Sequence, residues 1–281
     1  MPYDIPSHNG EQQLIFKRVG ERKIPLIFLP PTQKNYDRAP VYFIITGGGW
    51  HTGSARGMLG FSRASVDALR ARGWAVASIE YRLTGEGATI DDIISDCMDA
   101  GRYLRRFENE LGIDMSRVYV SGHSAGAHLA LMVSHAPHAD FCADSPFDAI
   151  TDDFTVLGCA PMSPITYLYA LDGASPVNFD FDRLFKDSVY DLDAAHRASP
   201  LDYINAASVP TLIVCGTHDT LVYPDNSTRF YDRSRALGAP CEIICSERGG
   251  HCFESMVKDE PSCPNMLDVQ LEIVAFARQF E

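Results

Sequence analysis

Residues 118–130 read Val-Tyr-Val-Ser-Gly-His-Ser-Ala-Gly-Ala-His-Leu-Ala, with Ser124 at the centre of a Gly-x-Ser-x-Gly motif. An apolar run precedes the motif and an alanine-rich run follows it, which predicts a strand, a tight turn and a helix. Small residues at Gly122 and Gly126 permit that turn, which would expose a strained Ser124 at the head of the helix. A glycine-rich turn with an incidental serine could explain the motif alone but not this context. The pattern therefore predicts a nucleophilic serine.

A serine hydroxyl is a poor nucleophile unless a histidine, oriented by a carboxylate, takes its proton. In this type of fold the three residues follow one another as serine, acid and histidine. Asp219 comes shortly after the apolar run 211–216, and His251 follows two glycines beyond the last apolar run. We expect both on loops at the carboxyl ends of strands, where α/β sheets place their sites. Asp225 is the nearest alternative acid, because aspartates are also common in turns.

Three glycines follow another apolar run in residues 44–51, Ile-Ile-Thr-Gly-Gly-Gly-Trp-His. Such a loop can turn its amides inward and form an oxyanion hole together with the amide of Ala125. Phosphate binding is the alternative, but the loop lacks both the Gly-x-Gly-x-x-Gly spacing and a P-loop lysine.

The rest of the chain alternates between strand-like and helix-like patterns. Residues 14–19 and 23–29 flank Gly20 and predict an antiparallel hairpin. Six later apolar runs suit strands buried on both faces, and they span residues 41–46, 74–81, 118–121, 154–159, 211–216 and 241–246. Apolar residues recur at helical spacing in 90–107, where Asp91 and Asp92 favour the start of a helix, and again in 266–280. This order predicts an α/β fold with a mostly parallel sheet and helices on both sides.

One connection is too long for this pattern. Residues 163–209 form an insertion that we expect over the site. The sequence leaves open whether the aromatic side chains of this insertion pack within a lid or line a substrate site. These side chains are Tyr167, Tyr169, Phe179, Phe181, Phe185 and Tyr190.

Composition excludes several other classes of protein. The 281 residues are 46% hydrophobic and 22% charged, which is ordinary for a globular protein. The net charge is −13, with no basic stripe, so nucleic acid and anionic membrane surfaces are not expected partners. No apolar run is long enough to span a membrane, and residues 1–13 lack the pattern of an export signal. The eight cysteines are too few for a disulfide scaffold, and Cys159, Cys215, Cys241 and Cys245 lie in apolar runs like small core residues. We therefore expect reduced thiols and a cytoplasmic protein.

From about Val41 onward the chain resembles α/β-hydrolases of the esterase/lipase type, related to hormone-sensitive-lipase-like and feruloyl/acetyl-xylan-esterase-like enzymes. Residues 77–83, Ala-Ser-Ile-Glu-Tyr-Arg-Leu, are similar to the strand of that family that ends in Tyr-Arg, and residues 111–117 are similar to the approach to its nucleophile strand. The resemblance implies a single α/β-hydrolase domain over 1–281, with the insertion as a cap. It makes Ser124 the nucleophile, His251 the base, Asp219 the orienting acid, and Gly48, Gly49 and Ala125 the oxyanion donors. Thr46 stands where the family's loop usually begins with histidine.

Other candidate residues have simpler interpretations. His123 should project away from Ser124 and pack, and His128 should be a core or supporting residue. His135, His138 and Asp140 are metal-ligand types, but they lie where the nucleophile helix should end and lack further ligands, so no metal is expected. Cys252 should fill space beside His251.

The resulting hypothesis is a serine carboxylesterase that needs no cofactor and cleaves short-chain acyl esters of small molecules or oligosaccharides. Trp50, directly after the glycines, is a candidate wall of the acyl site, or else a core residue that supports the loop. The preference for acetyl esters rests on analogy with the family. Two alternatives stay open: an amide hydrolase with the same triad, and a non-catalytic binding protein of the same fold.

Overall fold

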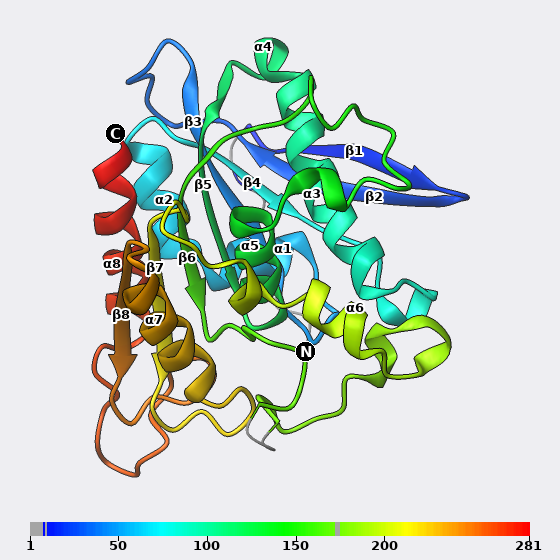
Figure 1. Ribbon diagram of the computed structural model, residues 1–281. Coiled ribbons are helices and arrows are strands. Elements are labelled where there is room, and N and C mark those ends of the chain that lie inside the picture. The colour runs from blue at the N-terminus through cyan, green and yellow to red at the C-terminus, as the bar shows by residue number, and fades with distance from the viewer. Residues whose placement is uncertain (1–7, 9, 172–174) are drawn as a thin grey trace.

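The computed structural model describes residues 8, 10–171 and 175–281. In these residues, eight strands form one sheet in the order β1-β2-β4-β3-β5-β6-β7-β8 (Figure 1). The hairpin of β1 (Gln12–Val19) and β2 (Arg22–Leu29) is antiparallel, and β2 also pairs antiparallel with β4 (Ala75–Ile79). All pairs from β4 to β8 are parallel. The predicted hairpin and the mostly parallel sheet are confirmed.

The strands agree closely with the apolar runs. They are β3 (Ala39–Ile45), β5 (Ile113–His123), β6 (Val156–Met162), β7 (Thr211–Gly216) and β8 (Cys241–Ser246). The main difference is β5, which begins well before the predicted residue 118. Ile113 at its start lies opposite Ala39 of β3, and the register shifts before Val118 pairs with Val41.

Two helical layers cover the sheet. One apolar cluster joins Val41 and Phe43 to α3 (Ile90–Arg106), α5 (Ala125–His135) and α7 (Asp225–Leu237). The other joins Tyr42 and Ile44 to α1 (Ala55–Phe61), α2 (Arg63–Ala71) and α8 (Met266–Ala277). Successive residues of a strand face opposite sides, so β3 contributes alternately to both clusters. Short helices α4 (Glu108–Leu111) and α6 (Leu192–Arg197) complete the set.

The start of α3 illustrates how local sequence specifies an element. Thr89 and Asp92 form a capping box: the Thr89 N–H donates to Asp92 Oδ2 (2.9 Å) and the Asp92 N–H donates to Thr89 Oγ1 (3.4 Å). These bonds satisfy amides that a helix leaves unpaired at its N-terminus. The predicted role of the acidic residues there is confirmed for Asp92.

Strand β8 departs from the prediction. It is an edge strand, and most of its residues are half-buried or exposed, so the expectation of burial on both faces is wrong here. For the same reason Cys245 is exposed and Cys241 half-buried rather than core residues, whereas Cys159 and Cys215 are buried. A pattern of apolar residues does not reveal which strand lies at the edge. All eight cysteines are free.

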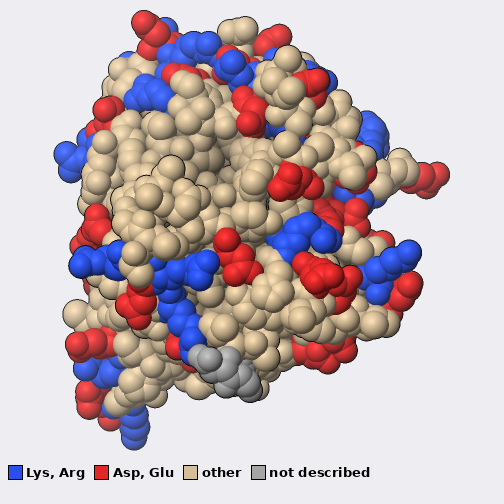
Figure 2. All heavy atoms as spheres, in the orientation of Figure 1, with Lys and Arg blue, Asp and Glu red and all other residues tan. Residues whose placement is uncertain are grey.

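The surface has no segregated charge on the face seen in Figure 2, where acidic and basic side chains alternate. Among the described helices, none combines the length and the apolar character needed to cross a membrane.

Candidate active site

Ser124 lies between β5 and α5, at the carboxyl edge of the sheet. Its backbone has φ 57° and ψ −123°, a left-handed conformation that residues other than glycine rarely adopt. The Ser124 N–H donates to the Met162 carbonyl (2.9 Å), and its own carbonyl accepts from the amides of Ala127 and His128. The next strand and the first turn of the helix therefore hold the strained turn.

The two flanking glycines are required by space. A Cβ at Gly122 would lie 2.2 Å from the Gly126 carbonyl oxygen, and one at Gly126 would lie 2.2 Å from that of Ile45. Only glycine allows these backbones to approach so closely. The turn predicted from the motif is the turn that the structure contains.

Asp219 and His251 meet beyond the ends of β7 and β8. His251 Nδ1 and Asp219 Oδ2 are 2.6 Å apart, and Asp219 Oδ1 accepts from the amides of Leu221 and Val222, both at 2.9 Å. Asp219 is 4% exposed, so this carboxylate is buried and fully hydrogen-bonded. Asp225 instead pairs with Tyr167 and Arg229 at the surface of α7. The structure thus brings Asp219, and not Asp225, to His251.

The glycine loop after β3 lies against the serine turn, because a Cβ at Gly47 would be 2.5 Å from the His123 carbonyl oxygen. Gly48 and Gly49 have φ values of 115° and 60°. Within the described residues, the N–H groups of Gly48, Gly49 and Ala125 donate no hydrogen bond. Three amides without a partner beside a serine at a helix N-terminus can receive a negatively charged oxygen.

A cavity of about 880 Å³ joins these groups. Ser124, His251, Gly48 and Gly49 line it, so nucleophile, base and loop amides share one space. The insertion supplies part of the wall through residues of 179–188, among them Phe179, Asp180, Arg183 and Leu184. The volume is in the range typical of sites for small molecules.

Trp50 lines this cavity although it is only 1% exposed. Its ring makes edge contacts with Phe179 and Phe181 of the insertion, both at 6.4 Å between centroids, and with His128 at 5.3 Å. Trp50 therefore lines the cavity and is also packed against neighbouring side chains. Of the aromatic side chains in the insertion, Phe179 faces the cavity at 37% exposure, whereas Tyr167, Phe181 and Phe185 are buried.

His123 has a role that the sequence did not indicate. We expected it to project away from Ser124 and to pack. It does pack, against Phe61 at 4.5 Å between ring centroids, but it also lines the cavity, and its Nε2 donates to the backbone carbonyl of His251 (2.9 Å). Burial and the nearby His251 ring lower its pKa to about 4, so the ring is neutral and acts as a donor. Ser163 Oγ donates to the same carbonyl (3.0 Å). Both contacts join segments far apart in the chain, so no local pattern could reveal them.

The remaining candidates are accounted for within the protein. His128 is fully buried and bonds the Ala198 carbonyl (2.7 Å). His138 bonds Asp153 and the Val133 carbonyl. Burial raises the pKa of Cys252 to about 11, which makes it a poor nucleophile. Among the described residues, no group of three or more His, Cys, Asp or Glu side chains is arranged to hold a metal ion.

Comparison with known proteins identifies the family of this chain. The BD-FAE family matches residues 26–233, which include Ser124, Asp219 and the glycine loop. The chain belongs to the BD-FAE family. The family resemblance inferred from the motifs is thereby confirmed.

Individual relatives of this BD-FAE member have low sequence identity to it. The probable carboxylic ester hydrolase LipM of Mycobacterium tuberculosis is 27% identical over 203 residues, 71% of this chain and 46% of its own length. Esterase LipC of the same organism is 27% identical over 202 residues, 71% of this chain and 49% of its own length. The chain thus spans about half the length of the curated relatives that it matches. The thermophilic esterase Est2 of Thermogutta terrifontis superimposes with a TM-score of 0.77 at 23% identity, over 99% of this chain and 95% of Est2. That likeness confirms the α/β-hydrolase fold.

Proposed function

We propose that this protein is a serine carboxylesterase that works through an acyl-enzyme. The observation that carries the proposal is one cavity lined by a strained serine, by a histidine hydrogen-bonded to a buried aspartate, and by two loop glycines whose amides donate no hydrogen bond within the described residues. Ester hydrolysis by this mechanism needs a nucleophile, a base oriented by an acid, and donors for the oxyanion, and these groups supply all of them. The family and the names of its relatives support the same reaction class.

In the first half of the reaction, Ser124 Oγ attacks the acyl carbonyl carbon while its proton passes to His251 Nε2. Asp219 accepts the Nδ1–H of His251 and stabilises the imidazolium that forms. The carbonyl oxygen becomes negative and is held by the amides of Ala125, Gly48 and Gly49. His251 then gives its proton to the leaving alcohol.

In the second half, water enters and His251 takes one of its protons as the water attacks the acyl-enzyme. Collapse of the second oxyanion intermediate releases the acid and returns the proton to Ser124. No step requires a group other than the side chains and amides named here.

We further propose short acyl groups, such as acetyl, and a carbohydrate or small-molecule alcohol. Trp50 and Phe179 both line the cavity that contains Ser124, and their rings contact each other at 6.4 Å between centroids, so bulky aromatic walls are available to limit the size of the acyl group. The BD-FAE family suggests acetyl or feruloyl esters of carbohydrates. Structures of Est2 are described with propionate or butyrate bound, which is consistent with small acids in this fold.

The test is a set of p-nitrophenyl esters of graded acyl length, acetylated xylo-oligosaccharides, and a peptide-amide control. Ser124→Ala should lower ester hydrolysis by on the order of 10⁴-fold or more and leave the fold intact by circular dichroism. Unchanged turnover in Ser124→Ala would refute the serine mechanism. Faster hydrolysis of the amide than of any ester would replace the esterase by an amidase.

A further inference from the structure

The glycine loop carries two of the three proposed oxyanion donors, yet its glycines have no side chains to hold it in place. A buried side chain reaches it from the neighbouring strand. Tyr81, which follows β4 and is 1% exposed, donates its hydroxyl proton to the Thr46 carbonyl (2.9 Å). Burial raises the pKa of Tyr81 well above its usual value, so the hydroxyl stays protonated and remains a donor.

The Thr46 carbonyl, which accepts this bond, lies at the start of the glycine loop and so sets the direction in which the loop leaves β3. Thr46 C=O and Gly47 N–H belong to one planar peptide group, so holding the carbonyl orients that plane. Gly48 and Gly49 follow with positive φ, where glycine has wide conformational freedom. The other side of the carbonyl is closed by α5, since a Cβ at Gly126 would lie 2.6 Å from Thr46 O. Tyr81 supplies the directional contact that packing alone does not.

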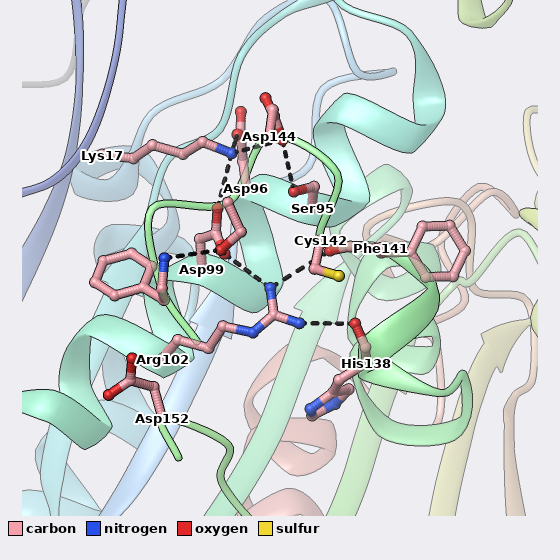
Figure 3. A network of polar contacts seen from close by, with 12 residues as sticks. Lys17, Ser95, Asp96, Asp99, Arg102, His138, Phe141, Cys142, Asp144 and Asp152 are labelled. Carbon is pink, nitrogen blue, oxygen red and sulfur yellow. Dashed lines mark hydrogen bonds and ion pairs between the residues drawn. The ribbon is translucent and has the colours of Figure 1, made fainter. Parts of the chain in front are cut away.

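Tyr81 is itself anchored. The next residue, Arg82, donates its backbone N–H to Asp96 Oδ2 (2.9 Å), and its guanidinium grips both oxygens of that carboxylate at 2.8 Å. Asp96 lies on α3, is fully buried, and also pairs with Lys17 of β1 (2.9 Å). Figure 3 shows Lys17 reaching toward the carboxylates of Asp96 and Asp144. A bidentate pair inside such a network has one preferred geometry.

A second contact joins the same segment to the loop. The Thr84 N–H donates to the Trp50 carbonyl (3.0 Å), beyond the glycines. Residues 81–84 therefore hold the loop at its first peptide group and at its far end.

We propose that Tyr81 is a positioning residue, which orients the loop amides for the oxyanion through its bond to Thr46. The inference rests on the proposed esterase function. Its consequence is specific: loss of the hydroxyl should weaken stabilisation of the transition state more than binding of the neutral ester, because the amides act on the charge that develops.

The experiment compares Tyr81→Phe with Tyr119→Phe. Tyr119 is a matched control, because it is fully buried in the same sheet and donates its hydroxyl proton to a backbone carbonyl, that of Ile273 (3.2 Å), away from the cavity. Both variants should lower the melting temperature. Only Tyr81→Phe should lower kcat for p-nitrophenyl acetate, by tenfold or more, with KM within about twofold. Its inhibition constant for a trifluoromethyl ketone, which forms a tetrahedral oxyanion adduct, should rise in parallel with the loss in kcat.

Equal kcat values for the two variants, with Ser124→Ala inactive, would overturn the role of Tyr81 and leave the esterase proposal standing. Absence of ester hydrolysis by the wild type would overturn both. If Tyr81→Phe does not fold, Arg82→Lys is compared with Arg102→Lys. Arg82→Lys loses the bidentate ion pair with Asp96. Arg102→Lys is the control, because Arg102 pairs with Asp99 in the same network without contacting residues 81–84. A kcat loss common to both lysine variants would also refute the inference.

Discussion

Replacing Asp219 by asparagine should nearly abolish catalysis while the fold stays intact. The reason lies in the two oxygens of the carboxylate. Oδ1 accepts from the amides of Leu221 and Val222, and Oδ2 meets His251 Nδ1 at 2.6 Å. An asparagine would keep its oxygen toward the two amides, because its NH₂ group cannot accept hydrogen bonds. The NH₂ group would then face His251.

The histidine would respond by changing tautomer. With an N–H donor opposite it, Nδ1 becomes the acceptor and Nε2 carries the proton, so Nε2 cannot take the proton of Ser124. We expect kcat to fall by on the order of 10⁴-fold, which corresponds to about 5 kcal/mol of transition-state stabilisation. Asparagine is nearly isosteric with aspartate, so the melting temperature should change by only a few degrees.

The matched control is Asp225→Asn, six residues further along. Asp225 forms a surface pair with Arg229 on α7, its side chain is 49% exposed, and pairs of this kind contribute little. Its kcat should stay within about threefold of the wild type. The assay is steady-state hydrolysis of p-nitrophenyl acetate, with active-site titration to count folded enzyme. Equal losses in both variants, or more than about a tenth of wild-type kcat in Asp219→Asn, would show that the acid is misassigned.

Three further predictions test other parts of the structure. Gly216→Ala would place a Cβ 2.3 Å from the Gly250 carbonyl oxygen and push the His251 loop away from Asp219, so kcat should fall at least 100-fold. The control is Gly85→Ala, whose Cβ would have no neighbouring atom within 4 Å, and its kcat should stay within twofold of the wild type. Equal kcat values in the two variants would contradict this account of the loop contact. Acetyl and propionyl esters should give the highest kcat/KM, with a steep fall beyond butyryl, since each surplus methylene costs ~1–3 kcal/mol. Phe179→Ala should extend the range of acyl chains hydrolysed to octanoyl esters with little loss of stability. Trp50→Ala should also lower the melting temperature, because Trp50 is buried. A wild type that prefers octanoyl esters would refute the short-acyl proposal. Burial lowers the pKa of His128 to about 4, below its ordinary 6.5, so the unfolded chain takes up a proton that the folded protein excludes. The stability due to neutral His128 is therefore complete above pH 6.5 and declines as the pH falls toward 4, by up to about 1.4 kcal/mol per pH unit; urea unfolding of His128→Gln between pH 7 and 5 should show a shallower decline, and parallel slopes would argue against the shift.

The sequence alone was sufficient for the parts of this protein that short segments encode. The turn at Ser124 depends on two glycines within a few residues of it, and the start of α3 depends on Thr89 and Asp92. Apolar runs marked β3, β4 and β7, because every residue of these strands is buried in the sheet. The expected order of serine, acid and histidine along the chain then indicated Asp219 and His251, with Asp225 left as the alternative acid.

Only the tertiary structure decided how distant segments meet. The 2.6 Å contact between His251 and Asp219, the support of His251 by His123 and Ser163, and the bond from Tyr81 to Thr46 each join residues from different loops or strands. The exposure of β8 likewise follows from its place at the edge of the sheet rather than from its composition. Periodicity and turn chemistry act over a few residues, whereas these contacts depend on strand order and packing. A single sequence carries no local signal of those two properties.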